Sequence, residues 1–242
     1  MNKNRETVFH FKQFSLSNSL SAMKVGTDGV LLGAWARVPV AAADRSVLDV
    51  GCGTGVIGLM IAQRYSDVAV TCIDISAEAV DECSGNISRS PFDSRIEAGR
   101  HDFLDYRDNR KYGLIVSNPP FFTERLHSPD ALRASARHDD SMPLPSLLRC
   151  AVSLLSPGGC IALVLPAARD NEVLLEASLA GLHPVRQCKV YTRRGKASRR
   201  TLWEFSLTHS GACEPSELFI QDGDGNFTEQ YKALLRDFYL HF

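Results

Sequence analysis

The 242-residue chain lacks any apolar run close to the roughly 20 residues that a membrane-spanning helix needs. Its polar first residues, 1–6, do not lead into the apolar core of a signal peptide. The seven cysteines are an odd number without a C-x-x-C pair, which argues against a disulfide framework and a zinc site. These absences predict a soluble, cytoplasmic protein without a metal.

An excess of positive charge is also missing, because 27 Lys and Arg residues face 28 Asp and Glu residues. The chain as a whole therefore has no basic field that would attract nucleic acid. A local exception is residues 193–200, Arg-Arg-Gly-Lys-Ala-Ser-Arg-Arg, with five cations in eight residues. Any nucleic acid would have to be held by such a patch.

What the chain does contain is a glycine-dense stretch at residues 46–58, Ser-Val-Leu-Asp-Val-Gly-Cys-Gly-Thr-Gly-Val-Ile-Gly. Its apolar run and the helical spacing that follows predict a buried strand turning tightly into a helix. Glycines let the backbone approach a ligand, and the N–H groups of a new helix favour an electron-rich group. A tight turn without a ligand is the alternative.

Two features precede this stretch. Residues 9–14 alternate apolar and polar side chains, which predicts a short strand or hairpin arm. Residues 23–36 predict a helix capped by Thr27 or Asp28. The start of that segment is either a simple helix entry or a lid over the ligand site, with Lys24 and Asp28 facing the ligand.

Strand and helix patterns alternate along the rest of the chain. Further strands are predicted at 68–73, 95–98, 114–117, 160–165, 185–191 and 201–208, and helices at 77–88, 144–155, 172–179 and 231–238. The alternation predicts an α/β fold with a doubly wound, mostly parallel seven-stranded sheet and a C-terminal antiparallel hairpin. Residues 211–227 read as turn-rich. Without a repeat or long linker, one domain over 1–242 is expected.

Acidic residues follow two of the predicted strands. Asp74 lies roughly twenty residues after the glycine turn, where a carboxylate can accept hydrogen bonds from both hydroxyls of a ribose. Asp102 follows the next strand and either accepts a hydrogen bond from an adenine amino group or is a turn residue.

The glycine turn itself has two interpretations. Residues 53–58 satisfy the G-x-G-x-x-G pattern of dinucleotide enzymes. Asp49, however, lies two residues before the first glycine, and an acid there suits a ligand with a cationic ammonium end better than a pyrophosphate. S-adenosylmethionine is such a ligand, with a ribose for Asp74 and an adenine for the pocket near Asp102.

Two motifs carry a family resemblance. Residues 49–55, Asp-Val-Gly-Cys-Gly-Thr-Gly, resemble motif I of the class I S-adenosylmethionine-dependent methyltransferases, and residues 118–121, Asn-Pro-Pro-Phe, resemble their motif IV for amino-group targets. The resemblance implies a Rossmann-like methyltransferase fold with S-adenosyl-L-methionine as cofactor. The residues expected to bind this cofactor are Lys24, Gly26, Thr27, Asp28, Asp49, Gly51, Gly53, Gly55, Asp74, Ile75, Asp102, Phe103 and Asn118.

The chemistry of an amino-group target explains the second motif. An exocyclic amino group is a poor nucleophile, so its two hydrogens must be held by acceptors while its lone pair faces the methyl donor. The side-chain oxygen of Asn118 and a backbone carbonyl of Pro119 or Pro120 can supply these acceptors, and proline fixes the backbone. Phe121, helped by Phe122, offers a flat face for stacking. The expected catalytic residues are Asn118, Pro119, Pro120 and Phe121.

The N-terminal part narrows the resemblance. Residues 11–14 and 23–35 are similar to the bacterial tRNA (adenine-N6) methyltransferases that modify the adenine 3′ of the anticodon, position 37, in valine tRNA. In that family the segment 24–28 helps to close the cofactor site, which implies that residues 1–40 form an arm and lid. A monomer that binds the anticodon stem-loop is expected. The phosphate contacts would then be Arg133, Arg137, Arg193, Arg194, Lys196, Arg199 and Arg200, with a solvated basic turn as the alternative.

Other functions stay open at this point. The Asn-Pro-Pro-Phe motif also serves enzymes that methylate a guanine N2 in rRNA or a glutamine amide of a protein. A dinucleotide-dependent oxidoreductase would use the same glycine turn. A non-catalytic RNA-binding module would keep the fold without transferring a methyl group.

Overall fold

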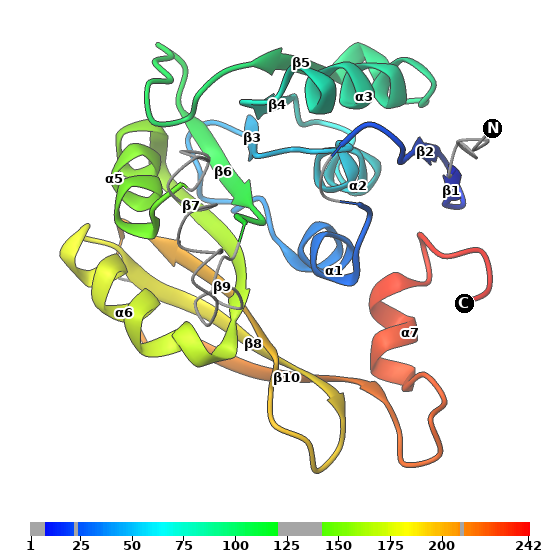
Figure 1. The fold of residues 1–242 in the computed structure, drawn as a ribbon. Coiled ribbons are helices and arrows are strands. Elements are labelled where there is room, and N and C mark those ends of the chain that lie inside the picture. Colours follow the sequence, from blue (N-terminus) through cyan, green and yellow to red (C-terminus); the bar gives the residue numbers. More distant parts are fainter. Residues whose placement is uncertain (1–7, 22–23, 121–141, 209–210) are drawn as a thin grey trace, which may run out of the picture.

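The computed structural model describes residues 8–21, 24–120, 142–208 and 211–242 (Figure 1). The strands are β1 Val8–His10, β2 Ser15–Ser17, β3 Val47–Val50, β4 Val70–Asp74, β5 Ile96–Arg100, β6 Tyr112–Ser117, β7 Leu155–Pro166, β8 His183–Arg193, β9 Arg200–Ser206 and β10 Glu214–Gln221. The helices are α1 Thr27–Trp35, α2 Val56–Arg64, α3 Ala77–Ser88, α5 Leu144–Leu154, α6 Asp170–Leu179 and α7 Glu229–Leu235. None of the described helices is long and apolar enough to cross a bilayer.

Eight strands form the main sheet, in the order β10-β8-β9-β7-β6-β3-β4-β5. Only β9 runs antiparallel to its neighbours among the described strands of this sheet. The predicted α/β fold, with a mostly parallel sheet and a late antiparallel hairpin, is therefore confirmed.

The count of seven strands was wrong, because β10 adds an eighth strand within the stretch predicted to be turn-rich. This strand lies at the edge of the sheet, parallel to β8, and only Leu218 of its side chains is buried. Its apolar run is only three residues long, 218–220, which is too short to predict a strand within a stretch of turn residues.

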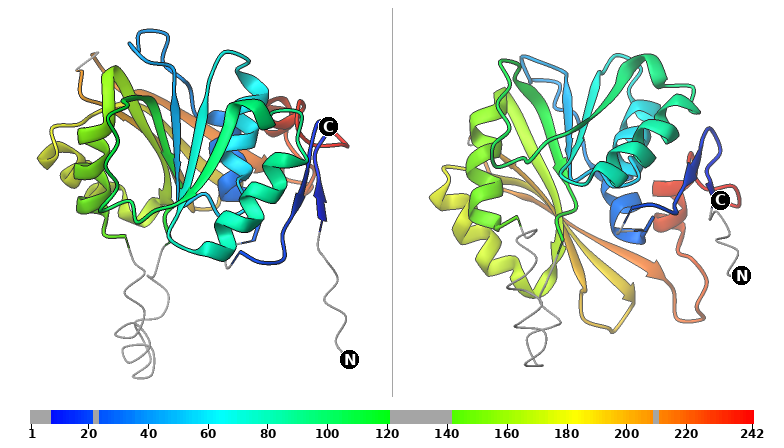
Figure 2. Two further views of the ribbon diagram at one scale, coloured as in Figure 1. Left: turned by 90° about the horizontal axis from the view of Figure 1, so that it is seen from above. Right: turned by 45° about the horizontal axis from the view of Figure 1, so that its top comes forward.

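Helices cover both faces of the sheet (Figure 2). One core joins the sheet to α1, α2, α3 and α7, and a second core joins it to α5 and α6. Helix α1 approaches α2 closely because Gly33 has no side chain; a Cβ there would lie 3.0 Å from the side chain of Met60. This contact places α1 beside the helix that follows the glycine turn.

The start of α1 corrects one prediction. Gly26 is its N-cap residue, and Thr27 and Asp28 lie within its first turn, where neither caps the helix through its side chain. Asp28 instead forms an ion pair with Arg200, 2.7 Å long between Oδ2 and Nε. The Asp28 carboxylate is therefore engaged by a partner far along the chain.

An N-terminal hairpin is present as the antiparallel pair β1 and β2, but the predicted extent was wrong, because residues 9 and 10 lie in β1 whereas residues 11–14 connect the two strands. It lies against the C-terminal region (Figure 1), where the backbone N–H of Lys12 donates to the carbonyl of Phe238 at 2.8 Å. The ring centroids of Phe9 and Phe11 are each 6.0 Å from that of Tyr239. These aromatic contacts fix the two terminal regions to each other.

A buried ion pair fixes the other end of α1. Arg186 of β8 and Glu204 of β9 lie 3.0 Å apart with almost no side-chain exposure. Arg186 also donates to the carbonyl of Trp35 and stacks 3.7 Å from its ring centroid, and Glu204 accepts from the backbone of Arg37. The pair therefore ties the end of α1 to the antiparallel part of the sheet.

Replacing Arg186 with Met should leave Glu204 buried without its cation and lower the free energy of unfolding by about 3–5 kcal/mol. Combining R186M with E204L should recover most of that loss, because no unpaired charge remains. Urea denaturation measures both variants. Removal of an exposed charge by E229Q, whose pair with Lys232 lies at the surface, should cost less than about 1 kcal/mol. An R186M loss no larger than that of E229Q would contradict the expectation.

Candidate active site

The C-terminal ends of the parallel strands bring the predicted site residues together. Val50 ends β3, Asp74 ends β4 and Ser117 ends β6, and parallel pairing places these three ends at one edge of the sheet. The glycine turn, Asp74 and Asn118 therefore meet there. Ligands of open α/β sheets bind at this edge.

Three glycines shape the turn between β3 and α2. Gly51, Gly53 and Gly55 have φ values of +69°, +52° and +81°, a region that other residues rarely adopt. A Cβ at Gly55 would also lie 2.7 Å from Sγ of Cys83, whereas one at Gly51 would meet nothing within 4 Å. Gly55 is thus required for packing, and Gly51 borders open space that a ligand can enter.

Asp74 and Ile75 lie beside this open space. The Asp74 carboxylate accepts from the backbone N–H groups of Gly53 and Ser76, both at 3.0 Å, and stays partly accessible. Ile75 exposes 47% of its surface directly after this carboxylate. A partly open carboxylate beside an exposed apolar side chain fits a ribose that carries a flat base, as S-adenosylmethionine does.

Asp102 and Phe103 contribute less open surface. Asp102 accepts from the backbone N–H of Leu104 at 2.9 Å, so it serves as a turn residue while its carboxylate remains exposed. Phe103 is buried in the core with 2% exposure. A cofactor contact by Phe103 would have to come from its backbone, and contacts by both residues stay predictions.

Asp49 lies beneath the turn instead of facing open space. It is fully buried, and its Oδ2 accepts from the backbone N–H of Gly58 at 2.9 Å, which ties the first turn of α2 to β3. Burial, followed by the neighbouring Cys83, raises its pKa from 3.8 to about 8. Its carboxylate is fully buried in this structure, and its predicted contact with an ammonium group stays a prediction.

Two polar residues of α3, which no motif singled out, hold the N-terminal segment at the site. The buried carboxylate of Glu82 accepts from the backbone N–H groups of residues 19–21 and from the hydroxyls of Ser19 and Ser21. Asn86 bonds both backbone groups of Ser17 and donates to the carbonyl of Thr54, within the glycine turn, at 2.9 Å. The available signal was their spacing of four residues, which puts both on one face of the helix.

The segment 24–28 follows this anchored region. Lys24 is exposed and donates to the carbonyl of Ser19, and the backbone of Val25 donates to Asn18. Just beyond the segment, a Cβ at Gly29 would lie 3.3 Å from Val56, the first residue of α2. The segment therefore leads directly to the contact between α1 and the start of α2, and its role as a lid stays a prediction.

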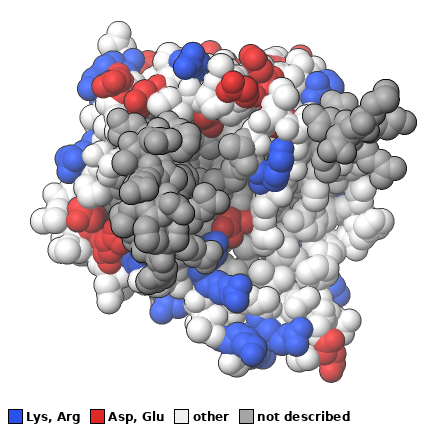
Figure 3. Space-filling view, viewed as in Figure 1, with Lys and Arg blue, Asp and Glu red and all other residues white. Residues whose placement is uncertain are grey.

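The basic run projects from the same edge of the sheet. It joins the end of β8 to the start of β9, and Figure 3 shows Lys and Arg gathered at the bottom of the molecule, where Figure 1 places this hairpin. Four of its cations are exposed: Arg193, Arg194, Lys196 and Arg199. Arg200 is half-buried in its pair with Asp28. Phe121, Arg133 and Arg137 lie outside the described residues.

Comparison with known proteins identifies the family. A family model of the methyltransferase small domain matches residues 29–192. The chain belongs to this methyltransferase family. It is 41% identical to a tRNA1(Val) (adenine(37)-N6)-methyltransferase of Bacteroides thetaiotaomicron, over 96% of this chain and 97% of the relative. A protein of the same name from Aeromonas salmonicida is 40% identical over 98% of both chains.

Solved structures agree on the fold of this methyltransferase. A predicted O-methyltransferase from Agrobacterium tumefaciens superimposes with a TM-score of 0.64 at 19% identity, over 87% of this chain and 96% of the other. A glycopeptide N-methyltransferase solved with S-adenosyl-L-methionine gives a TM-score of 0.52 at 13% identity, over 70% and 84% of the two chains. Both are similar in fold alone.

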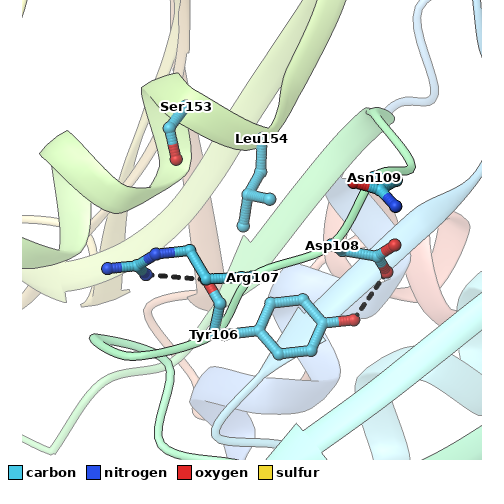
Figure 4. Close-up of a pocket in the computed structure, with 6 residues that line it drawn as sticks. All are labelled: Tyr106, Arg107, Asp108, Asn109, Ser153 and Leu154. Carbon is cyan, nitrogen blue, oxygen red and sulfur yellow. Dashed lines mark hydrogen bonds between the residues drawn. The ribbon is translucent and has the colours of Figure 1, made fainter.

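A pocket of about 470 Å³ lies at the opposite end of β6 of the methyltransferase (Figure 4). It is formed by residues 106–109 and the end of α5, whereas Asn118 follows the other end of β6. Its acid, Asp108, accepts from the hydroxyls of Tyr106 and Tyr112 and from Arg110. These bonds use the Asp108 carboxylate to hold the loop together. Because the pocket lies at the other end of β6 from Asn118, it is separate from the candidate active site.

The pH dependence of stability should reveal the role of Glu82 in the methyltransferase. Burial alone would raise its pKa, but hydrogen bonds from Ser21 and the neighbouring backbone outweigh burial and hold the pKa at about 2. The stabilisation is thus complete above pH 4.5 and lost as the pH falls toward 2. At pH 7 the E82Q variant should be less stable by about 2 kcal/mol in urea denaturation, with the difference shrinking at pH 3.

The control for E82Q is D81N, which changes the neighbouring exposed acid on α3 and should alter stability by less than about 0.5 kcal/mol. Equal stability of E82Q and D81N at pH 7 would show that the Glu82 hydrogen bonds are unimportant.

Asp49 should behave as a neutral acid near pH 7. Because its pKa is raised from 3.8 to about 8, the stability it gives is complete below pH 3.8 and declines until pH 8. The free energy of unfolding of the wild type, relative to D49N, should therefore fall between pH 4 and 8. S-adenosylhomocysteine binding by calorimetry at pH 7 should change by less than about threefold in D49N. A loss beyond tenfold would instead support a direct ammonium contact by a charged Asp49.

Proposed function

We propose that the chain transfers a methyl group from S-adenosyl-L-methionine to N6 of the adenine at position 37 of a valine tRNA, in the cytoplasm. The name of its relatives, at about 40% identity over nearly the whole chain, supports the substrate. The observation that carries the chemistry is the meeting of Asn118-Pro119-Pro120 with the glycine turn at the ends of adjacent strands.

Different residues at the sheet edge bind S-adenosylmethionine and the target adenine. Asp74 accepts from the ribose hydroxyls, Ile75 packs on the adenine, and the open space at Gly51 takes the amino-acid end. When bound, S-adenosylmethionine supplies an electrophilic methyl group. Asn118 and a carbonyl of the following prolines accept hydrogen bonds from the two hydrogens of the target amino group. The lone pair of the nitrogen is then free to attack the methyl group. Orientation supplies most of the rate acceleration, and no covalent enzyme intermediate is required.

RNA approaches from the side of the basic hairpin. Its exposed cations contact phosphates of the anticodon stem-loop and set the register of the RNA on the protein. The target adenine turns out of its stack to reach Asn118. Residues 1–40 form the arm and lid over the cofactor site. Phe121 completes the acceptor site, and Arg133 and Arg137 complete the RNA site. The protein acts as a monomer and without a metal.

Replacing Asn118 with Ala should lower kcat for methyl transfer by about 100-fold or more, because one acceptor of the amino hydrogens is lost. S-adenosylhomocysteine binding, measured by calorimetry, should stay within about twofold of wild type. The control is N109A, an exposed Asn before the opposite end of β6, which should keep full activity. A similar loss in both variants would contradict the assignment.

The target is tested with labelled S-adenosylmethionine and separate pools of tRNA, rRNA and protein, followed by mass spectrometry of the modified nucleoside. Label in tRNA as N6-methyladenosine supports the proposal. Label as methylguanosine in rRNA or in a protein amide would overturn the substrate while keeping the chemistry. Absence of label with tight binding of NADH would overturn both.

A further inference from the structure

Arg200 differs from the other cations of the basic run. The side chains of Arg193, Arg194, Lys196 and Arg199 are exposed, while Arg200 keeps 35% of its side-chain surface and pairs with Asp28 at 2.7 Å. The pair joins residues 172 positions apart in the chain. A guanidinium already engaged by a carboxylate is not available to a phosphate in the same way as its exposed neighbours.

The register of the sheet explains where Arg200 points. Arg200 pairs with Pro166 at the C-terminal end of β7, at the edge where the glycine turn and Asn118 lie. Side chains alternate along β9, so Arg200 shares the face of Leu202, which belongs to the core around α1. Thr201 and Trp203 face the other way and donate to Asp170 of α6. The hairpin is therefore held from both faces of the sheet at its base.

Helix α1 can transmit this contact to the cofactor site. Its far end is fixed by Arg186, and its flank packs on α2 through Gly29 and Gly33. Its first turn carries Asp28 and Gly29, and Gly29 packs beside Val56, which directly follows the glycine turn. A displacement of Arg200 would therefore move the end of α1 that borders the cofactor site.

We propose that Arg200 is a positioning residue that couples the RNA-facing hairpin to the cofactor site through Asp28, and that it is not a phosphate ligand. The inference rests on the proposed function for the nature of its two ligands. RNA bound to the exposed cations of the hairpin acts through Arg200 and Asp28 on the start of α1. Coupling between two binding sites is reciprocal, so the cofactor also favours RNA binding.

The test compares R200Q with R199Q, which removes the neighbouring exposed cation. Calorimetry without RNA should show that R200Q weakens S-adenosylhomocysteine binding by about five- to tenfold while R199Q leaves it unchanged. Binding of valine tRNA, measured over a range of salt concentrations, should give the opposite pattern. In R199Q the magnitude of the slope of log K against log salt concentration should fall by about one, as expected for one lost phosphate contact. R200Q should keep the wild-type slope.

Exchanging the two charges distinguishes loss of the Asp28–Arg200 ion pair from a general loss of structure. D28R and R200D should each weaken S-adenosylhomocysteine binding, and the double variant D28R/R200D should recover at least half of the loss on a logarithmic scale. Thermal unfolding of each variant shows whether it is folded, and the milder R200K should lie between wild type and R200Q.

Two results would overturn the inference: a lower salt slope in R200Q with unchanged S-adenosylhomocysteine binding, or no recovery in the folded double variant. A wild-type protein that fails to methylate tRNA would refute the proposed function instead. The calorimetric comparison without RNA would still decide whether Arg200 positions the cofactor site.

Discussion

The backbone conformation of the turn between β3 and α2 is the constraint on which the rest of the site depends. Its three glycines with positive φ bring the N–H of Gly53 to Asp74 and the carbonyl of Thr54 to Asn86. Strand β4, helix α3 and, through Asn86, the N-terminal segment are therefore fixed by the same few peptide groups. Since a side chain at Gly55 would collide with Cys83, the packing of α3 depends on this turn as well.

Carboxylates around the turn differ in role because their surroundings differ. Asp49 is buried with one backbone donor, so its pKa rises, while Glu82 is buried with several donors, so its pKa falls. Asp74 stays partly open, and Asp28 forms an ion pair with a cation from a distant strand. The partly open carboxylate of Asp74 is suited to receive a ligand directly, whereas Asp49 and Glu82 are buried and shape the frame around it.

The sequence was informative wherever chemistry and fold are encoded locally. The alternation of strand and helix patterns predicted the parallel sheet. The predicted strand ends placed Asp49, Asp74 and Asn118 at one edge of that sheet. Burial of Asp49 could not be foreseen, because a motif gives residue types and not which side of the turn an acid occupies. The pairs of Asp28 with Arg200 and of Glu82 with residues 19–21 depend on contacts between distant segments. Strand β10 has an apolar run of only three residues, because its position at the edge of the sheet leaves just one of its side chains fully buried.

The contact between the two terminal regions has a consequence for the order in which the chain folds during synthesis. Phe9 and Phe11 pack against Tyr239, and the backbone of Lys12 bonds that of Phe238. A nascent chain emerges from its N-terminus, so Phe9 and Phe11 stay without Tyr239 until that residue has left the ribosome. The methyltransferase can therefore form this contact only after the strands of the central sheet have been made.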